Sequence, residues 1–271
     1  MKYIKVGFGG EVWVEYPLGM RFPRAFRTNY PFRGRGVVSR ILYCLNYLRL
    51  DRILFRSYEN PHLDKIGFND VAYFWPSRER SSGRFYGYRV ENGIVVEYLK
   101  FGSTEIERAK LSKEADNVVK ISSVPGMLFE VPSCLGVELH HGVIVVRYVP
   151  LPSTARSLPV SCSWYDKIDV VRRQIAEAGY SHGDFSWHNF KTDGTRVWIL
   201  DWEEMRSCVD PGVDEMSLKY GYAIYWQHKT LDEALADFDM RKLSCVRDLA
   251  ERNISPGRIM LKYLQDKGRL S

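Results

Sequence analysis

The sequence between Tyr180 and Glu203 reads YSHGDFSWHNFKTDGTRVWILDWE and contains the residues that decide the fold class. Asp184 follows a His-Gly pair, Asn189 comes five residues later, and Asp201 follows the apolar run VWIL. Phosphoryl transfer from ATP needs such a set: one carboxylate to accept a proton from the attacking hydroxyl, and an amide oxygen and a second carboxylate to bind Mg²⁺. The order and spacing of these residues therefore predict a phosphotransferase site.

The size and composition of the chain place it among ordinary globular proteins. Its 271 residues are 45% hydrophobic and 27% charged, which allows two modest lobes and excludes disordered or fibrous classes. The net charge of +6 favours anionic partners such as nucleotide phosphates, acidic glycans or an anionic membrane surface, without choosing among them. The aromatic content of 14% suits ring stacking on sugars, and equally suits large aromatic cores.

Cysteine usage and the apolar segments indicate a cytoplasmic protein. The five cysteines are odd in number and widely spaced, which argues against a disulfide framework or a zinc site and favours a reducing compartment. Charged residues interrupt the N-terminal stretch MKYIKVGFGGEVWVEY, so it does not resemble a signal peptide. No apolar run is long enough to cross a bilayer. We therefore expect a soluble protein, at most peripheral to the inner face of the membrane.

Residues 1–60 are expected to form a basic, partly helical N-terminal extension. Between Val38 and Phe55, apolar residues recur at helical spacing, with Arg40, Arg49 and Arg52 among them. A basic amphipathic helix of this kind either lies on an anionic membrane or packs on its own domain, and packing is the more common case.

The rest of the chain is expected to form two further regions. Residues 61–149 are predicted to contain strands at 70–75, 84–90 and 94–100, a helix at 104–120, and strands at 128–131 and 143–149. Residues 150–271 are predicted to be mostly helical, with a helix over 164–178 that ends at Gly179, a strand over 196–200, and helices after Pro211. The predicted fold class is α+β.

This arrangement resembles the protein-kinase-like superfamily, and most closely its small-molecule and glycan branch of aminoglycoside phosphotransferases, choline kinases and lipopolysaccharide-core kinases. The resemblance rests on His182-Gly183-Asp184 with Asn189, on Asp201-Trp202-Glu203 at a strand end, and on the element order over residues 66–225. It implies a two-lobed fold, with an antiparallel sheet and one helix in the first lobe and a mostly helical second lobe. It also implies ATP and Mg²⁺ as cofactors, Asp184 as the catalytic base, and Asn189 and Asp201 as magnesium ligands.

In such folds a lysine on the third strand pairs with the nucleotide phosphates and with a glutamate on the following helix. Lys100 ends the predicted strand IVVEYLK, and strand alternation places it on a defined face of the sheet. Glu114 lies on the side of the next helix that faces the sheet. We predict the pair Lys100–Glu114, with Glu105 and Glu107 as open alternatives to the glutamate.

Two further segments are expected to contact the nucleotide. Ser82-Gly83, between two strands, offers backbone N–H groups and a hydroxyl to phosphate oxygens, although no G-x-G-x-x-G motif is present. Arg147-Tyr148-Val149 ends a strand and leads into the second lobe, where the adenine-binding hinge falls in the family. There the backbone, rather than the side chains, is expected to bind the base.

Two departures from the protein-kinase pattern limit the classes of acceptor that we expect. Gly183 precedes Asp184 where regulated protein kinases have an arginine, and no Ala-Pro-Glu signal follows the short stretch from Asp201 to Asp214. Little room is left for a peptide-docking platform, so we expect the acceptor to be a hydroxyl of a sugar, a glycan or another alcohol. The compact segment 151–180 and the sequence Trp187-His188-Asn189 look most like lipopolysaccharide-core kinases, which act on Kdo or heptose.

Three alternative functions remain open at this point. The first is an aminoglycoside or small-metabolite kinase, whose acceptor pocket would be acidic and could draw on Glu203, Glu204, Asp210, Asp214 and Glu215. The second is a pseudokinase, which the intact set of three polar residues argues against. The third is a nucleic-acid-binding module, but the basic residues are dispersed and no recognised motif is present, so no nucleic-acid partner is expected.

Overall fold

The computed structural model divides into two compact units. It describes residues 2–6, 12–16, 57–59, 71, 73–77, 82–91, 94–159, 161–207, 212–252, 254 and 257–268. Unit 1 comprises residues 1–116 and 132–154, and unit 2 comprises residues 117–131 and 155–271. The division falls within one helix, after Asp116.

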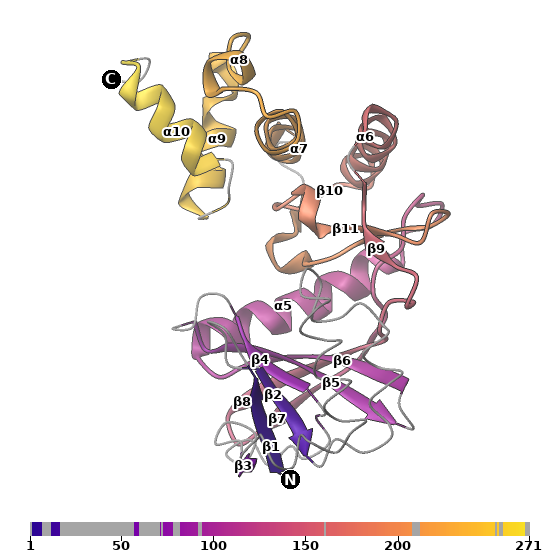
Figure 1. The fold of residues 1–271 in the computed structure, drawn as a ribbon. Coiled ribbons are helices and arrows are strands. Elements are labelled where there is room, and N and C mark those ends of the chain that lie inside the picture. The colour runs from indigo at the N-terminus through magenta and orange to yellow at the C-terminus, as the bar shows by residue number, and fades with distance from the viewer. Residues whose placement is uncertain are drawn as a thin grey trace. The chain divides into compact units, whose positions relative to one another are not determined.

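Unit 1 is built on an antiparallel sheet of eight strands in the order β3-β1-β2-β4-β5-β6-β8-β7 (Figure 1). The strands are β1 (Lys2–Val6), β2 (Val12–Tyr16), β3 (Ser57–Glu59), β4 (Tyr73–Pro76), β5 (Arg84–Glu91), β6 (Ile94–Gly102), β7 (Cys134–His140) and β8 (Val143–Tyr148). Strands β5 and β6 form the expected hairpin, in which Glu91 is paired with Ile94. The N-terminal strands β1, β2 and β3 are hydrogen-bonded into the same sheet.

The core of unit 1 is aromatic and aliphatic, and helix α5 (Glu105–Ser122) packs on it. Phe74, Leu99 and Phe101 are completely buried together in the sheet. Gly102 of β6 lies directly against the backbone of Glu107, so that a Cβ at position 102 would come within 2.9 Å of it. This close approach fixes the helix beside the strand that carries Lys100.

In unit 2, helix α6 (Cys162–Glu177) is followed by a loop-rich segment. The Ser161 hydroxyl caps α6 by accepting a hydrogen bond from the Trp164 N–H at 3.3 Å. Gly179 follows the helix with φ of +84°, the left-handed conformation expected of it. The short strands β9 (Arg156–Ser157), β11 (Phe190–Thr192) and β12 (Val197–Ile199) form one small sheet, and β10 (Tyr180–Ser181) pairs with β13 (Arg206–Ser207).

The remainder of unit 2 is helical and has its own core. Its elements are α7 (Gly212–Tyr225), α8 (Leu231–Ala234), α9 (Leu243–Glu251), α10 (Gly257–Asp266) and the 3₁₀ turn η4 (Met240–Lys242). Buried side chains of α7, α9 and α10, such as Met216, Leu249 and Met260, form a common cluster. None of the described helices combines the length and the apolar character needed to span a membrane.

The α+β fold class is confirmed, with an antiparallel sheet and one long helix in unit 1 and mostly helices in unit 2. One predicted strand is wrong. Residues 128–131 form only a single bridge, between Glu130 and Trp198, and the fourth strand of the predicted order is instead β7 (Cys134–His140). The basic helix expected between Val38 and Phe55 lies outside the described residues. The expected domain boundaries at residues 60 and 149 stay a prediction.

Candidate active site

The loop that carries Asp184 is fixed by a carboxylate at the start of helix α7. Asp214, only 3% exposed, accepts hydrogen bonds from the backbone N–H groups of His182 at 2.7 Å and Gly183 at 2.8 Å. The His182 ring is completely buried and its Nε2 lies 2.9 Å from the carbonyl oxygen of Leu200. Leu200 directly precedes Asp201, so this contact connects the loop that carries Asp184 to the segment that carries Asp201.

Gly183 is a position that only glycine fits. Its φ is +85°, and a Cβ there would lie 2.4 Å from the carbonyl oxygen of Glu204. The guanidinium of Arg252 also approaches, donating from Nη1 to the Gly183 carbonyl at 2.9 Å. The departure from the protein-kinase arginine at this position thus has a local steric cause.

The Asp184 carboxylate is oriented by two neighbours in its own loop. The Ser186 hydroxyl donates to its Oδ1, and the Asn189 amide donates from Nδ2 to its Oδ2 at 3.3 Å and to its main-chain oxygen at 3.0 Å. The exposed His188 ring lies 4.0 Å from Oδ2. Asp184 itself is half-buried, so that its carboxylate is held in a fixed direction without being enclosed.

Asp201 adopts a backbone conformation that is uncommon for a residue with a side chain. It has φ of 59° and ψ of 63°, in the left-handed region, and precedes the 3₁₀ turn η3 (Trp202–Glu204). The Leu200 N–H donates to the Asn189 carbonyl at 3.0 Å, which ties the end of β12 to the 3₁₀ turn η2 (Trp187–Asn189). A non-glycine residue held in this conformation is a common mark of a functional position.

The donor set of Asn189 and Asp201 fits Mg²⁺. Mg²⁺ prefers oxygen ligands and is commonly bound by one or two protein oxygens together with substrate phosphates and water. Because Asn189 uses its Nδ2 for Asp184, its Oδ1 is the atom left for a metal. In the described parts of the chain no group of three or more His, Cys, Asp or Glu residues is placed to hold a metal ion.

In unit 1 the structure brings Lys100 and Glu114 together. The Lys100 Nζ lies 2.7 Å from Glu114 Oε1, and the two side chains are only 6% and 3% exposed. Of the alternative glutamates, Glu107 is paired with Arg84, whereas Glu105 is exposed at the first turn of α5. The Lys100 Nζ also lies 5.9 Å from the ring centroid of Tyr148. The role of this pair in nucleotide binding stays a prediction.

The Ser82-Gly83 segment packs against the start of helix α5. Gly83 has φ of +79°, and a Cβ there would lie 2.6 Å from Ser103 Oγ. The Ser82 carbonyl accepts from the Thr104 hydroxyl at 2.9 Å, and the Gly83 carbonyl accepts from the Ser103 N–H at 2.9 Å. The carbonyls are therefore used within unit 1, and phosphate binding by the N–H groups of this turn stays a prediction.

The Arg147-Tyr148-Val149 segment is strongly tied to its own sheet. The Arg147 guanidinium donates to Glu97 at 2.7 and 3.1 Å and to Glu138 at 2.5 Å. These hydrogen bonds, first those to Glu97 and then those to Glu138, raise the pKa of Arg147. The Val149 N–H donates to the Ser133 carbonyl at 2.9 Å, and base binding by the backbone of this segment stays a prediction.

Sequence reasoning missed three residues that shape the site. Ser186 is two residues from Asp184, a spacing at which a hydroxyl commonly reaches a neighbouring carboxylate, so its role could have been found. The roles of Asp214 and Arg252 could not have been found in this way. Both contact Gly183, but Asp214 is 31 residues and Arg252 is 69 residues away from it in the sequence. Arg252 also donates to Asp248 at 2.6 Å and lies 3.7 Å from Glu204, which fixes its guanidinium beside the loop.

Comparisons with known proteins give weak similarities. No protein-family model matches the sequence, and no curated protein matches it. Among solved structures, the complex of WbdD with the kinase inhibitor LY294002 has a TM-score of 0.44 at 15% identity and covers 66% of this chain and 44% of that chain. The Rio2 kinase–ADP/Mg²⁺–phosphoaspartate complex from Chaetomium thermophilum has a TM-score of 0.43 at 15% identity and covers 76% and 74%.

A further structure, of the bifunctional kinase-methyltransferase WbdD, has a TM-score of 0.34 at 18% identity and covers 46% of this chain. The chain spans less than half of the length of these WbdD structures. The residues that bear on function are those of this chain's own site. These residues are the Lys100–Glu114 ion pair, Asp184 and Asn189 joined within one loop, and Asp201 in a left-handed backbone conformation after strand β12. The chain has an α+β fold, with an antiparallel sheet in unit 1 and mostly helices in unit 2.

Proposed function

We propose that this protein transfers the γ-phosphate of ATP, in a Mg²⁺-dependent reaction, to a hydroxyl group of a sugar or glycan. The observation that carries the proposal is the fixed Asp184 carboxylate, held by Ser186 and Asn189 in a loop whose backbone is anchored by Asp214. A carboxylate held in this way can orient a hydroxyl and accept its proton. A loop that served only as a surface turn would need none of these buried contacts.

The chemical step assigns one task to each residue. The oxygen of the acceptor hydroxyl forms a bond to the γ-phosphorus, and the bond between that phosphorus and the bridging oxygen of ADP breaks. Asp184 accepts the proton that the acceptor hydroxyl loses. Lys100, held by Glu114, supplies positive charge for the nucleotide phosphates. Mg²⁺, when bound by Asn189 and Asp201, neutralises charge on the phosphates. Asp214 holds the loop in place and does not react.

The internal contacts of the acidic residues favour a sugar acceptor over a cationic drug or choline. Asp214 is buried under the loop, and Glu204 lies 3.7 Å from Arg252. Glu215 accepts from Lys242 at 2.7 Å. Because these carboxylates have cationic or backbone partners within unit 2, they offer little uncompensated negative charge to a polyamine. Asp210 lies outside the described residues.

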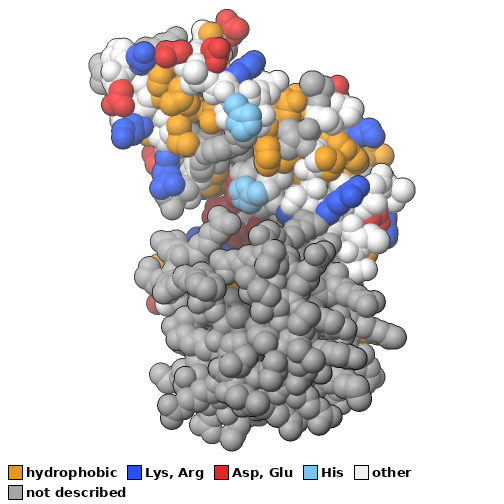
Figure 2. Space-filling view, viewed as in Figure 1, with side chains coloured by type: hydrophobic (Ala, Val, Ile, Leu, Met, Phe, Trp, Pro, Cys, Tyr) orange, Lys and Arg blue, Asp and Glu red, His pale blue; other side chains and the backbone are white. Residues whose placement is uncertain are grey.

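Lipopolysaccharide or surface-polysaccharide biosynthesis is the setting that we propose for this activity. A chain with a net charge of +6 is suited to anionic glycans and to the inner surface of a membrane. On the described part of unit 2 that Figure 2 shows, basic and acidic side chains lie interspersed with hydrophobic ones. Such a mixed surface favours local contacts with a glycan over general adhesion to nucleic acid.

A transfer assay tests the proposal. The full-length protein would be incubated with γ-labelled ATP and Mg²⁺ against core oligosaccharides, neutral sugars, aminoglycosides and choline. We expect label to pass to a sugar hydroxyl, and Asp184→Asn to lower the rate by roughly 10²–10⁴ without a comparable loss of nucleotide affinity. Asp266→Asn, which changes an exposed carboxylate at the end of α10, is the matched control and should leave transfer unchanged.

Three results would overturn the assignment. Near-normal transfer by Asp184→Asn would show that another group accepts the proton. Transfer to aminoglycosides or choline in preference to every sugar would replace the glycan acceptor by a cationic one. Binding of MgATP without transfer to any acceptor class would support a pseudokinase instead.

A further inference from the structure

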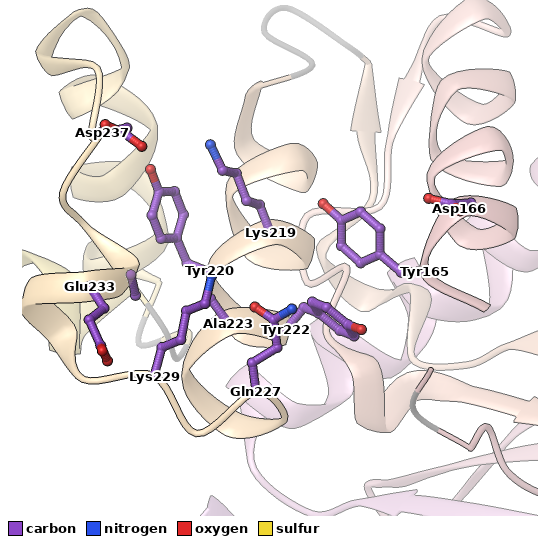
Figure 3. A pocket seen from close by; sticks show the side chains of 11 residues that line it. Tyr165, Asp166, Lys219, Tyr220, Tyr222, Ala223, Gln227, Lys229, Glu233 and Asp237 are labelled. Atoms are coloured by element: carbon purple, nitrogen blue, oxygen red, sulfur yellow. The ribbon is translucent and has the colours of Figure 1, made fainter. Parts of the chain in front are cut away.

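A cavity of about 370 Å³ lies in unit 2 and takes no part in the proposed transfer step. Its volume falls in the range of small-molecule sites, roughly 300–1,000 Å³. Figure 3 shows its side chains coming from α6 on one side and from α7, α8 and the adjoining loops on the other. Three tyrosines, three carboxylates, two lysines and one glutamine line it.

Aromatic side chains line this cavity from both α6 and α7. The rings of Tyr165 and Tyr222 lie 4.7 Å apart between centroids and are tilted by 45°. Tyr220 contributes a third ring and is 3% exposed. Both phenols carry their protons at neutral pH and can donate hydrogen bonds, and burial raises the pKa of Tyr220 to about 12 and also raises that of Tyr165.

The polar side chains of the cavity have hydrogen-bonding capacity to spare. Within the described parts of unit 2, Asp166, Lys219 and Asp237 form no ion pair, although all three line the cavity. Lys219 extends between Tyr220 and Tyr165 (Figure 3), with its Nζ 5.5 Å from the Tyr220 ring centroid. Gln227 adds an amide, which both donates and accepts.

The charges of the lining nearly balance, which indicates what kind of ligand would fit. Three carboxylates and two ammonium groups line the cavity, so a phosphate would meet excess negative charge and a polyamine would meet the ammonium groups of Lys219 and Lys229. A neutral sugar ring needs neither a positively charged nor a negatively charged lining. It offers an apolar C–H face to aromatic rings and a rim of hydroxyls to carboxylates, ammonium groups and amides.

We propose that this cavity binds a neutral sugar unit, at a site separate from the residue that accepts the proton. That the sugar belongs to the acceptor glycan rests on the proposed function. The sugar ring would stack on Tyr165 and Tyr222 and hydrogen-bond to Asp166 and Lys219. A glycan chain that is bound at this cavity has a raised effective concentration at the transfer site, because the two parts of the chain are covalently linked.

The cavity is also connected to the loop that carries Asp184. Tyr222 contacts the ring of Trp187 at 5.6 Å between centroids, and Trp187 is three residues from Asp184 and 5% exposed. Trp187 contacts Trp226 as well, at 6.4 Å. A sugar against Tyr222 would therefore change the surroundings of Trp187, which provides an optical signal for binding.

Titration of the full-length protein with neutral disaccharides, without ATP, tests the proposal. Maltose, lactose and mannobiose would be followed by calorimetry and by tryptophan fluorescence. We expect at least one to bind, and Lys219→Ala and Tyr165→Ala each to weaken that affinity by roughly tenfold, about 1.4 kcal/mol. Glu177→Gln, a change on the same helix α6 outside the cavity, is the matched control and should bind like the wild type. Trp187→Phe should remove most of the fluorescence change but not the calorimetric signal.

The same measurement separates this inference from the proposed function. Asp184→Asn should bind the disaccharide normally, because its carboxylate does not line the cavity. Sugar binding without phosphoryl transfer would support the cavity and contradict the kinase proposal.

Absence of binding by every disaccharide, or binding that both Lys219→Ala and Tyr165→Ala leave unchanged, would overturn the cavity assignment. Tighter binding of inorganic phosphate or spermidine than of any sugar would also overturn it. Lys219 is exposed, so that its variant tests the site even if Tyr165→Ala does not fold.

Discussion

Lys100 and Glu114 form an ion pair with 2.7 Å between Nζ and Oε1 in an almost completely buried setting. Burying two charges costs several kcal/mol per ion, and a hydrophobic pair of the same volume is often as stable or more stable. Stability alone therefore does not explain why this strand and this helix contain a lysine and a glutamate. The proposed role of Lys100, to hold a positive charge at a fixed position for the nucleotide phosphates, would explain it.

This relationship leads to a prediction with two variants. Lys100→Met should lower the free energy of unfolding by about 3–5 kcal/mol, because it leaves Glu114 buried without its cation. The double variant Lys100→Met/Glu114→Leu should recover most of that stability while remaining unable to bind nucleotide normally. Chemical denaturation and nucleotide titration of both proteins would check this. A stable double variant with wild-type nucleotide affinity would show that the pair is only structural.

Asp201 gives a prediction about metal dependence. Asp201→Asn should reduce the affinity for nucleotide in Mg²⁺ by roughly tenfold or more, because it removes a charged metal ligand. In EDTA the variant and the wild type should bind nucleotide equally. Asp184→Asn is the control, because it removes a carboxylate from the same region but should keep the gain in affinity that Mg²⁺ provides. Equal affinities of Asp201→Asn and wild type in Mg²⁺ would place the metal elsewhere.

Local patterns predicted much of the fold and part of the site. Strand alternation and helix spacing placed Lys100 and Glu114 on facing surfaces, and the structure joins them. The helix 164–178 with its glycine cap agrees with α6 and Gly179 to within two residues. These features depend on residues close in sequence, which is why one sequence is enough to find them.

Features that depend on long-range packing were not predicted. Strand β7 lies at an edge of the sheet, and its apolar residues Leu135, Val137 and Leu139 are exposed while the residues between them are more buried, so its pattern is opposite to the usual one. The sequence leaves Asp214 open as a carboxylate of an acidic acceptor pocket, but it is buried beneath the loop. Neither environment has a local signal.

Gly183 and Gly179 form a matched pair for testing the loop. Their φ angles are +85° and +84°, but a Cβ at Gly183 meets the Glu204 carbonyl at 2.4 Å whereas one at Gly179 meets nothing within 4 Å. Gly179→Ala should cost about 1–2 kcal/mol from the left-handed backbone alone. Gly183→Ala should cost a further 1–3 kcal/mol, roughly, from crowding, and should also slow transfer by displacing Asp184. Urea denaturation and the transfer assay would check this, and equal effects of the two variants would contradict it.

Tyr220 gives a prediction about stability at high pH. Burial, with smaller contributions from Glu215 and nearby aspartates, raises the pKa of Tyr220 from its usual 10 to about 12 in the folded protein. Between these two pH values the unfolded chain loses the phenol proton and the folded chain keeps it, so the free energy of unfolding should fall as the pH rises. The contribution is present below pH 10 and lost by about pH 12, and amounts to about 2–3 kcal/mol.

Tyr220→Phe keeps the ring packing on Phe238 and removes the titrating group, so its denaturation midpoint should decline less over this range than that of the wild type. All other tyrosines titrate in both proteins and cancel in the difference. Parallel declines of the two proteins from pH 9 to pH 12 would contradict the prediction.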